Sequence, residues 1–259
     1  MERELFGMIK GMLRRLGRRR RSRKQRYTDG TIVEVYFWAV INDRPTVWAC
    51  DPRHWAPGLR RGPLPSQSVM SRRLRTPRVE RLLRRLEDAV LRRGRAVPLV
   101  CIVDGKPLPI ANHSHDRQAG YGRAVGGKSK GYKLNAMIDA NGTVWAWRVA
   151  PMNGDERTMA RRLLRDLPGE GYLLADANYD SDQLFALAAG HGVQAVVPRR
   201  YGPDKGLGHR AYHPARLRSR DLLENGVSSF GADLHGLRRA IERFFGTLVC
   251  TGGGLSCLP

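Results

Sequence analysis

Two short apolar runs, each ended by an aspartate, constrain the fold of this chain more than any other feature. The first run, Val97–Val103, leads into Asp104, and the second, Tyr172–Ala175, leads into Asp176. Apolar runs of this length that are bounded by turn residues are typical of buried strands. Open α/β sheets bind their ligands at the carboxyl ends of the strands. The sequence therefore predicts that both carboxylates lie at the same edge of one sheet.

The segments between and after these runs predict a mixed sheet. "GYKLNAMIDANGTVWAWRVAP" has the pattern of a hairpin about Asn141-Gly142, and a turn is expected at Gly105–Pro107, before a second extended segment. "GDERTMARRLLRDLPGEG" and "SDQLFALAAGHG" carry the end signals of helices, and "VQAVVPRR" predicts a further short strand. The order of three antiparallel strands, helix, strand, helix and strand predicts an α/β domain whose mixed sheet is flanked by helices.

The first 30 residues combine an apolar helical pattern with an arginine run. Six apolar side chains fall near helical spacing, ahead of four consecutive arginines. Glu2 and Glu4 argue against an organelle transit peptide, since such peptides avoid acids. We interpret residues 1–30 as a basic N-terminal arm, either a grip on the DNA backbone or a solvated tail. The residues of the two patterns are Leu5, Phe6, Ile9, Met12, Leu13 and Leu16, and Arg18, Arg19, Arg20 and Arg21.

Residues 31–96 have the pattern of a helical region. "LPSQSVMSRRLRTPRVERLLRRLEDAVLRRG" indicates two helices separated at Thr76-Pro77, because Thr76 can cap a helix and Pro77 fits its first turn. We expect a DNA-binding module in which Arg72 and Arg73 contact DNA, with a basic helix pair that only packs as the alternative. The apolar stripe of the second helix is Val79, Leu82, Leu83, Leu86 and Val90.

The charge of the chain indicates a polyanionic partner. Lys and Arg outnumber Asp and Glu by 46 to 24, which gives a formal net charge of +22 distributed over 259 residues. Double-stranded DNA is the leading candidate. No stretch approaches the roughly 18 consecutive apolar residues of a membrane span, so a membrane partner is not expected. A small-molecule substrate is not expected either.

The cysteines and histidines give little indication of a metal or disulfide framework. The four cysteines lack Cys-x-x-Cys spacing and fit the reduced thiols of a cytosolic protein; they are Cys50, Cys101, Cys250 and Cys257. An ordinary loop role is favoured over zinc binding for four histidines, His113, His115, His209 and His213.

The C-terminal part of the chain predicts an insertion, a helix and a tail. Residues 199–236 are basic and rich in glycine, with little periodicity, so an ordered but irregular insertion is expected. "LRRAIERFFGTLV" predicts a helix with Glu242 beside an apolar face, and residues 250–259 predict an irregular tail. The apolar face is Leu237, Ile241, Phe244, Phe245 and Leu248.

Two carboxylates at one sheet edge predict a divalent cation. Like charges this close raise each other's pKa values unless a cation brings them together. Oxygen-only ligands suit Mg²⁺ or Mn²⁺. Such a site activates water and polarises a phosphodiester, in the two-metal arrangement with ions roughly 3.5–4 Å apart. For either aspartate alone, a role as a turn or cap residue is the alternative.

Four segments, "VDGKPLPI", "GYKLNAMID", "LLADANYDSDQL" and "LRRAIERFFGTL", together resemble the bacterial insertion-sequence transposases with a DDE catalytic domain of the RNase H-like fold. The resemblance covers about residues 97–249, and "WACDPRHWAP" and "LPSQSVMSRRLR" resemble the N-terminal region of such proteins. It implies Asp104, Asp176 and Glu242 as catalytic and metal-binding residues for Mg²⁺ or Mn²⁺. Glu224 and Asp233 are rival third carboxylates.

The third motif of the family is only partly kept. Many relatives have tyrosine, arginine and lysine where this chain has His235, Arg238 and Val249. Arg238 matches and can reach a phosphate or orient Glu242. Tyr179 and Asp180 belong to the same signature, and helix entry and packing are expected of them. Relatives usually continue further, so the chain is expected to be shortened at its C-terminus.

The resemblance implies a transposase that nicks DNA at element ends and joins it to a target. It further implies a homodimer on double-stranded DNA and a bacterial, cytoplasmic, nucleoid-associated location. The alternatives are an RNase H-like nuclease without strand transfer and an inactive DNA-binding remnant or repressor. The candidate DNA-binding residues are Arg238, Arg18, Arg19, Arg20, Arg21, Arg72, Arg73, Lys128, Lys130 and Lys133.

Overall fold

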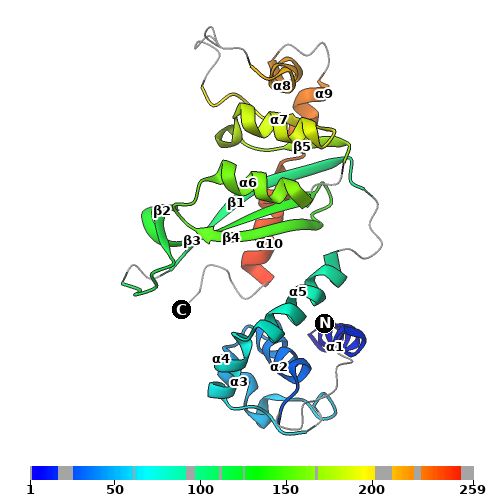
Figure 1. Ribbon diagram of the computed structural model, residues 1–259, viewed down its shortest axis with the longest axis vertical. Coiled ribbons are helices and arrows are strands. Elements are labelled where there is room, and N and C mark those ends of the chain that lie inside the picture. The colour runs from blue at the N-terminus through cyan, green and yellow to red at the C-terminus, as the bar shows by residue number, and fades with distance from the viewer. Residues whose placement is uncertain are drawn as a thin grey trace. The chain divides into compact units, whose positions relative to one another are not determined.

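The computed structural model describes residues 2–16, 26–60, 62–91, 97–110, 113–124, 126–166, 169–201, 212–224 and 229–251. Contacts among Cα atoms define two compact units, a helical unit built from Met1–Arg95 and a sheet unit built from Ala96–Leu248 (Figure 1). None of the helices in these ranges is both long enough and apolar enough to cross a membrane.

The helical unit has one core to which all its longer helices contribute. Thr28 begins the second helix as its N-cap, because its hydroxyl accepts a hydrogen bond of 3.0 Å from the Thr31 amide. Met70 and Val79, from two later helices, are fully buried in this core. The elements are α1 (Glu2–Leu16), α2 (Asp29–Ile41), α3 (Thr46–Ala49), η1 (Pro52–His54), α4 (Gln67–Leu74) and α5 (Pro77–Leu91).

The first helix corrects the prediction of a separate N-terminal arm. Phe6 is fully buried, and its ring packs edge-on against Trp38 and Trp55 at centroid distances of 5.0 and 5.7 Å. Ile9 and Leu13 are buried in the same core. α1 is therefore part of the helical unit, and neither a solvated tail nor a free arm describes Glu2–Leu16. The arginine run Arg18, Arg19, Arg20 and Arg21 lies outside the described residues.

The predicted pair of helices separated at Thr76-Pro77 is confirmed as α4 and α5. Val79, Leu82 and Leu86 form the buried stripe of α5, as predicted, whereas Val90 near its end is 48% exposed. The Thr76 hydroxyl donates a hydrogen bond of 2.7 Å to the carbonyl oxygen of Arg73. The break thus lies where the sequence predicted it, and the residue expected as a cap bonds back to the preceding helix.

The sheet unit contains a six-stranded mixed sheet, as predicted. Its order is β2-β3-β1-β5-β6, with β4 also paired to β3. β3 is antiparallel to β1, β2 and β4, whereas β1, β5 and β6 are parallel. The strands are β1 (Val100–Pro109), β2 (Gly120–Ala124), β3 (Gly127–Asp139), β4 (Val144–Pro151), β5 (Gly171–Leu174) and β6 (Val193–Val196).

The first strand differs from the sequence prediction, because no turn interrupts it at Gly105–Pro107. β1 continues to Pro109 and pairs with β3 along its whole second half, as far as Pro109↔Gly131. Its pairing with β5 ends at Ile102↔Leu174. Beyond that point no strand among the described residues pairs with this side of β1, and proline is tolerated at such sheet edges.

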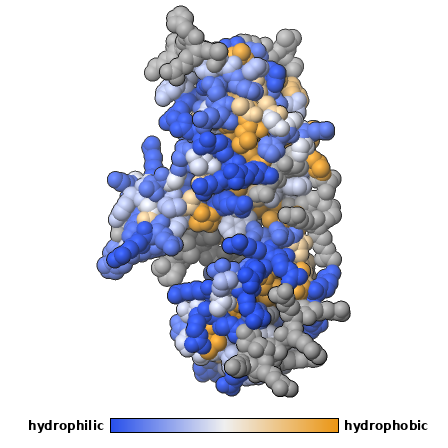
Figure 2. All heavy atoms as spheres, in the orientation of Figure 1, coloured by the Kyte–Doolittle hydropathy of each residue, from blue (hydrophilic) through white to orange (hydrophobic). Residues whose placement is uncertain are grey.

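Strand β2 was not predicted, because two glycines hide its pattern. A Cβ at Gly120 would lie 2.0 Å from the Asn153 side chain, and one at Gly122 would lie 2.7 Å from Met152. The close approach of the chain after β4 therefore requires glycine at both positions. Figure 2 shows hydrophilic side chains gathered over this projecting β2–β3 end of the sheet unit.

Helices cover both faces of the sheet. α6 and α7 pack on the face that carries Val103 and Met137, and α10 packs on the face that carries Ile102 and Leu174 (Figure 1). The predicted irregular insertion at 199–236 is corrected in part, since it contains two helices, α8 and α9. The elements are α6 (Glu156–Leu163), η2 (Leu164–Asp166), η3 (Ala177–Tyr179), α7 (Asp182–Gly190), α8 (Pro214–Glu224), α9 (Phe230–Gly236) and α10 (Arg239–Thr251).

Candidate active site

Asp104 and Asp176 lie beside each other at the carboxyl edge of the parallel part of the sheet. Each stands two residues beyond the last pair between β1 and β5, Ile102↔Leu174. Side chains alternate along strands, so both aspartates continue the sheet face that carries this pair and that α10 covers. The prediction that Asp104 ends its strand is wrong, because β1 continues to Pro109; Asp104 instead stands where β1 leaves its parallel neighbour β5.

Local hydrogen bonds hold both carboxylates. Asp104 Oδ1 accepts a bond of 2.7 Å from the Gly105 amide. Asp176 is the N-cap of η3, and its Oδ1 accepts a bond of 2.9 Å from the Asn178 amide. Asp176 therefore does act as a cap residue, the alternative role expected for either aspartate alone. Its Oδ2 also accepts a bond of 3.3 Å from the Asn178 side-chain amide, and each oxygen keeps a further lone pair for another partner.

Arg238 joins Glu242 to the same edge of the sheet. Its Nη1 donates to Asp104 Oδ2 at 3.1 Å, and its Nη2 donates to Glu242 Oε1 at 3.0 Å. Arg238 immediately precedes α10, and Glu242 lies in the first turn of that helix. Ile241 and Phe245 are buried against the sheet and fix the helix. The carboxylate is thereby directed toward Asp104.

The rival third carboxylates lie elsewhere. Glu224, at the end of α8, accepts a bond of 2.6 Å from Arg199 Nε. Asp233 is exposed on α9. Neither has a recorded contact with Asp104 or Asp176, whereas Glu242 is connected to Asp104 through one guanidinium. The geometry of the described residues therefore favours Glu242, and its assignment as a metal ligand stays a prediction.

The raised pKa of Asp104 indicates a site whose negative charge a bound cation would stabilise. Burial raises the pKa of the Asp104 carboxyl to about 6, and the charge of Asp176 acts in the same direction. The Gly105 amide and the Arg238 guanidinium oppose this rise, and the charge of Glu156 adds to it. A carboxylate that is costly to ionise in the metal-free chain is one that a bound cation would stabilise.

Sequence reasoning missed the pair of Glu156 and Lys133 beside this site. Lys133 Nζ donates to Glu156 Oε1 at 2.5 Å, and the two side chains are only 14% and 23% exposed. Glu156 is the first residue of α6, where an acid was expected only as a helix-start signal. Lys133 was predicted to bind DNA, which stays a prediction; in the structure its ammonium group is paired with Glu156. No sequence signal connects residues whose contact depends on how β3 and α6 pack.

Tyr179 is a further component of the site. It is fully buried, and its hydroxyl has no hydrogen-bond partner among the described residues. Burial raises the pKa of Tyr179 well above 10, and the charges of Asp104, Glu156 and Asp176 act in the same direction. The packing role expected from the sequence is consistent with this burial, while the electrostatic coupling to the acidic edge was not foreseen.

The remaining candidate DNA-binding residues are spread over both units. Lys128 lies on β3 with its Nζ 5.9 Å from the centroid of the Tyr121 ring, and Lys130 Nζ donates to Ser114 O at 2.5 Å. Arg72 is exposed and borders an open cavity of about 590 Å³ in the helical unit. Arg73 instead donates to Asp29 at 2.5 Å and is 15% exposed, so it is engaged in the fold.

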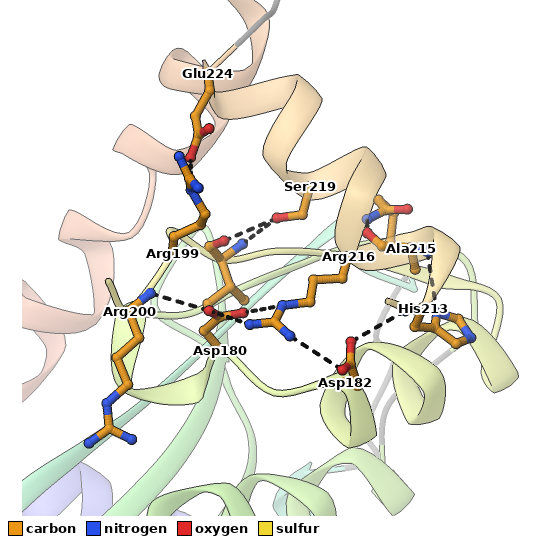
Figure 3. Close-up of polar contacts among 11 residues, drawn as sticks. Asp180, Asp182, Arg199, Arg200, His213, Ala215, Arg216, Ser219 and Glu224 are labelled. Carbon is orange, nitrogen blue, oxygen red and sulfur yellow. Dashed lines mark hydrogen bonds and ion pairs between the residues drawn. The ribbon is translucent and has the colours of Figure 1, made fainter. Parts of the chain in front are cut away.

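A second acidic cluster follows Asp176 along the chain and is closed by an arginine (Figure 3). Arg216 of α8 binds both oxygens of Asp180, each at 2.8 Å, and lies 3.3 Å from Asp182. Ser219, one turn further along α8, exchanges two hydrogen bonds with the backbone of Val197 after β6. α8 is thus attached to the loop that follows Asp176 and to the end of β6.

The donor set suits a divalent cation, although it is not assembled around one. Three carboxylates offer the oxygen ligands that Mg²⁺ and Mn²⁺ prefer. Within the described ranges, no three His, Cys, Asp or Glu side chains are arranged as a metal site, zinc sites included. His209 and Cys257 lie outside those ranges, and Cys50, Cys101 and Cys250 are free thiols.

The structure thus combines a mixed sheet, paired acids at the carboxyl edge of its parallel part and a third acid on the helix that covers one face. The description "Transposase DDE domain" belongs to the protein family that matches residues 95–249, and the chain belongs to this family. The DDE transposase family inferred from sequence is thereby confirmed, and the structure has the predicted mixed sheet flanked by helices, with further helices at the N-terminus.

No curated protein matches the chain. Among solved structures, the chain is similar to one in the crystal structure of a pre-cleavage Mos1 transpososome, with 15% sequence identity and a TM-score of 0.27. That match covers 91% of this chain and 82% of the other.

Proposed function

We propose that this chain is a DDE transposase that cleaves DNA at the ends of an insertion sequence and joins those ends to a target, with Mg²⁺ or Mn²⁺. One observation carries the proposal. Asp104 and Asp176 stand at the same level beyond neighbouring strands, and Arg238 connects Asp104 to Glu242. Membership of the transposase family supports the assignment.

The residues of the site have distinct tasks in this proposal. Asp104, Asp176 and Glu242 would hold the metal ions, which would supply activation of the attacking oxygen and charge stabilisation on the phosphodiester. Asp176 is kept in position by the Asn178 amide, and Glu242 by the buried face of α10. The raised pKa of Asp104 makes metal uptake more favourable at neutral pH than in acid, because a ligand must be deprotonated.

Double-stranded DNA is the proposed substrate, and a homodimer on two DNA ends is the proposed assembly. The formal net charge of +22 supports a polyanionic partner. Lys128 and Arg72 offer exposed charges for phosphate contacts, one in each unit. The bacterial insertion-sequence origin is part of the same proposal and rests on the resemblance of the sequence motifs.

A second candidate is a nuclease without strand transfer, or an inactive DNA-binding remnant. It is favoured by His235 and Val249, which replace the tyrosine and lysine of many relatives. His235 Nε2 lies 3.3 Å from the carbonyl oxygen of Ala175, the residue before Asp176. His235 therefore contacts the end of β5, but it lacks the phenol group of the tyrosine found in many relatives. Loss of that group would affect the handling of DNA ends.

The test is nicking of a supercoiled plasmid with and without Mg²⁺ or Mn²⁺, followed by joining of an oligonucleotide with a free 3′-hydroxyl. Asp104→Asn, Asp176→Asn and Glu242→Gln should each remove the metal-dependent nicking. Asp233→Asn, on α9, is the matched control and should retain it. Nicking without joining would favour the nuclease, and DNA binding without nicking would favour the remnant. Nicking that survives in all three site variants would contradict the assignment.

A further inference from the structure

Arg238 lies between two of the carboxylates that are assigned to the metal. Its two terminal nitrogens donate separately, one to Asp104 and one to Glu242. The side chain is 22% exposed, while Glu242 is 58% exposed. The guanidinium therefore connects a shielded carboxylate with an open one at the solvent edge of the site.

A metal ion and this guanidinium compete for the same place. A dication held by Asp104 and Glu242 would lie a few ångströms from a guanidinium that binds the same carboxyl groups. Like charges at such distances repel, and more strongly in a partly buried site than in bulk water. Both cations cannot retain their full contact with these two carboxylates.

The position of Arg238 allows it to move. It lies between α9 and α10, just before the first residue of α10, and its long side chain has several rotatable bonds. Released from the carboxylates, its planar fork of N–H groups matches the oxygens of a phosphate in a bidentate contact. The next turn of α10 stays fixed by Ile241 and Phe245.

We propose that Arg238 is a displaceable internal counter-ion: it holds Asp104 and Glu242 together without metal, and metal loading releases it to bind a DNA phosphate. The inference rests on the proposed function for the identity of the metal site. Metal binding and phosphate binding then favour each other, and the coupling must be equal in both directions. The site is kept assembled before loading, and its arginine becomes available to DNA when the metal is in place.

The opposite role for Arg238 makes a different prediction. If the guanidinium only orients Glu242 for the metal, its removal disorders a ligand and weakens metal binding. If it is a displaceable counter-ion, its removal strengthens metal binding. The direction of the change in metal affinity therefore separates the two roles.

The first experiment titrates the full chain with Mn²⁺ by calorimetry. Arg238→Gln should bind Mn²⁺ roughly 5-fold or more tightly than the unmodified chain, the lower end of typical coupling strengths. Arg239→Gln is the matched control, because Arg239 is exposed and donates to Gly236 O at 3.3 Å. It should change the affinity by less than about twofold. Equal or weaker binding by Arg238→Gln would overturn the inference.

Two further variants test the same inference independently of Arg238→Gln. Arg238→Lys retains the charge but lacks the planar fork that spans two carboxylates, so this variant should bind Mn²⁺ more tightly than the unmodified chain. If Arg238→Gln does not fold, the Mn²⁺ affinity of Arg238→Lys tests whether Arg238 is a displaceable counter-ion. Asp104→Asn should lose most of the Mn²⁺ binding. Unchanged binding by Asp104→Asn would contradict the proposed metal site itself, and with it the inference.

The second experiment measures the affinity for a DNA duplex with and without Mg²⁺ at constant ionic strength. Mg²⁺ should strengthen DNA binding by the unmodified chain roughly 5-fold or more, and this gain should disappear in Arg238→Gln. The Arg239→Gln control should keep it. An equal gain in Arg238→Gln would overturn the release of Arg238 to phosphate, even if metal binding depends on Asp104 as expected.

Discussion

The sheet unit contains two clusters in which one arginine bridges two acids, and they differ in how closed they are. In the first, Arg238 makes one bond to Asp104 and one to Glu242. In the second, Arg216 holds both oxygens of Asp180, whose side chain is only 5% exposed (Figure 3). In the second cluster both Asp180 oxygens are engaged by Arg216, so the carboxylate has little capacity left to bind a ligand. In the first cluster Arg238 contacts only one oxygen each of Asp104 and Glu242. The difference indicates that the second cluster maintains the fold and the first serves chemistry.

The charges of the two clusters agree with this division. Burial lowers the pKa of Arg216, and the bonds to Asp180 and Asp182 more than offset it, so the pKa ends above its ordinary value. The acids Asp180 and Asp182 thus fully compensate the cost of burying the Arg216 charge. At Asp104, by contrast, burial raises the pKa and Arg238 compensates only in part. An incompletely compensated carboxylate is what a metal site without its metal should contain.

The largest expected effect is on stability and concerns the closed cluster. Arg216→Met leaves the Asp180 charge buried and unpaired, which should lower the free energy of unfolding by about 3–5 kcal/mol. Urea unfolding measures it. Adding Asp180→Asn should recover part of the loss, because no unpaired charge then remains. A loss below about 1 kcal/mol in Arg216→Met would mean that the cluster does not hold α8.

The second effect is on activity and concerns the open cluster. Asp104→Asn should reduce metal-dependent plasmid nicking by more than about 10²-fold, the loss that a misplacement of about 1 Å can already cause. DNA binding should change only a few-fold, because the cations that contact phosphate remain. Asp182→Asn, in the closed cluster and 45% exposed, is the control. Similar losses in both variants would remove the functional distinction between the clusters.

A smaller effect concerns pH. The pKa of Asp104 is raised to about 6 in the folded chain, so the folded state binds this proton more tightly than the unfolded state. Lowering the pH from 7 to 5 should therefore stabilise the metal-free chain relative to Asp104→Asn, by about 1 kcal/mol. Urea unfolding of both chains at the two pH values isolates the contribution. A relative change of zero, or of opposite sign, would contradict the raised pKa.

The smallest effect is the stability cost of opening the first cluster. Arg238→Gln should lower the free energy of unfolding by no more than about 1 kcal/mol, because Glu242 is 58% exposed and solvent replaces the lost bond. The measurement is the same unfolding experiment without metal, next to Arg216→Met. A loss as large as that of Arg216→Met would show that Arg238 is also a structural residue.

The acidic edge was predictable from sequence where short-range patterns determine it. The apolar runs before Asp104 and Asp176 predict strands, and alternation places both acids on one face. Glu242 follows from a helical pattern together with the family motif. The pairing of Lys133 with Glu156 was beyond sequence reasoning, because it depends on the register of β3 and the packing of α6.

Other features were misread for equally physical reasons. The apolar positions of α1 were recognised, but the arginine run after them favoured an exposed arm over a buried helix. The turn expected at Gly105–Pro107 is absent because β3 supplies pairing partners along the whole of β1. Strand β2 has glycine where close packing requires it, and glycine is typical of turns in a sequence.

A crystal of the chain soaked with Mn²⁺, with its anomalous signal mapped, tests the central claim most directly. We expect Mn²⁺ bound by Asp104 and Asp176, with Glu242 turned toward it and the Arg238 guanidinium withdrawn from both of its present partners. Signal confined to other residues, or none at a concentration that supports nicking, would contradict the assignment of this sheet edge as the metal site.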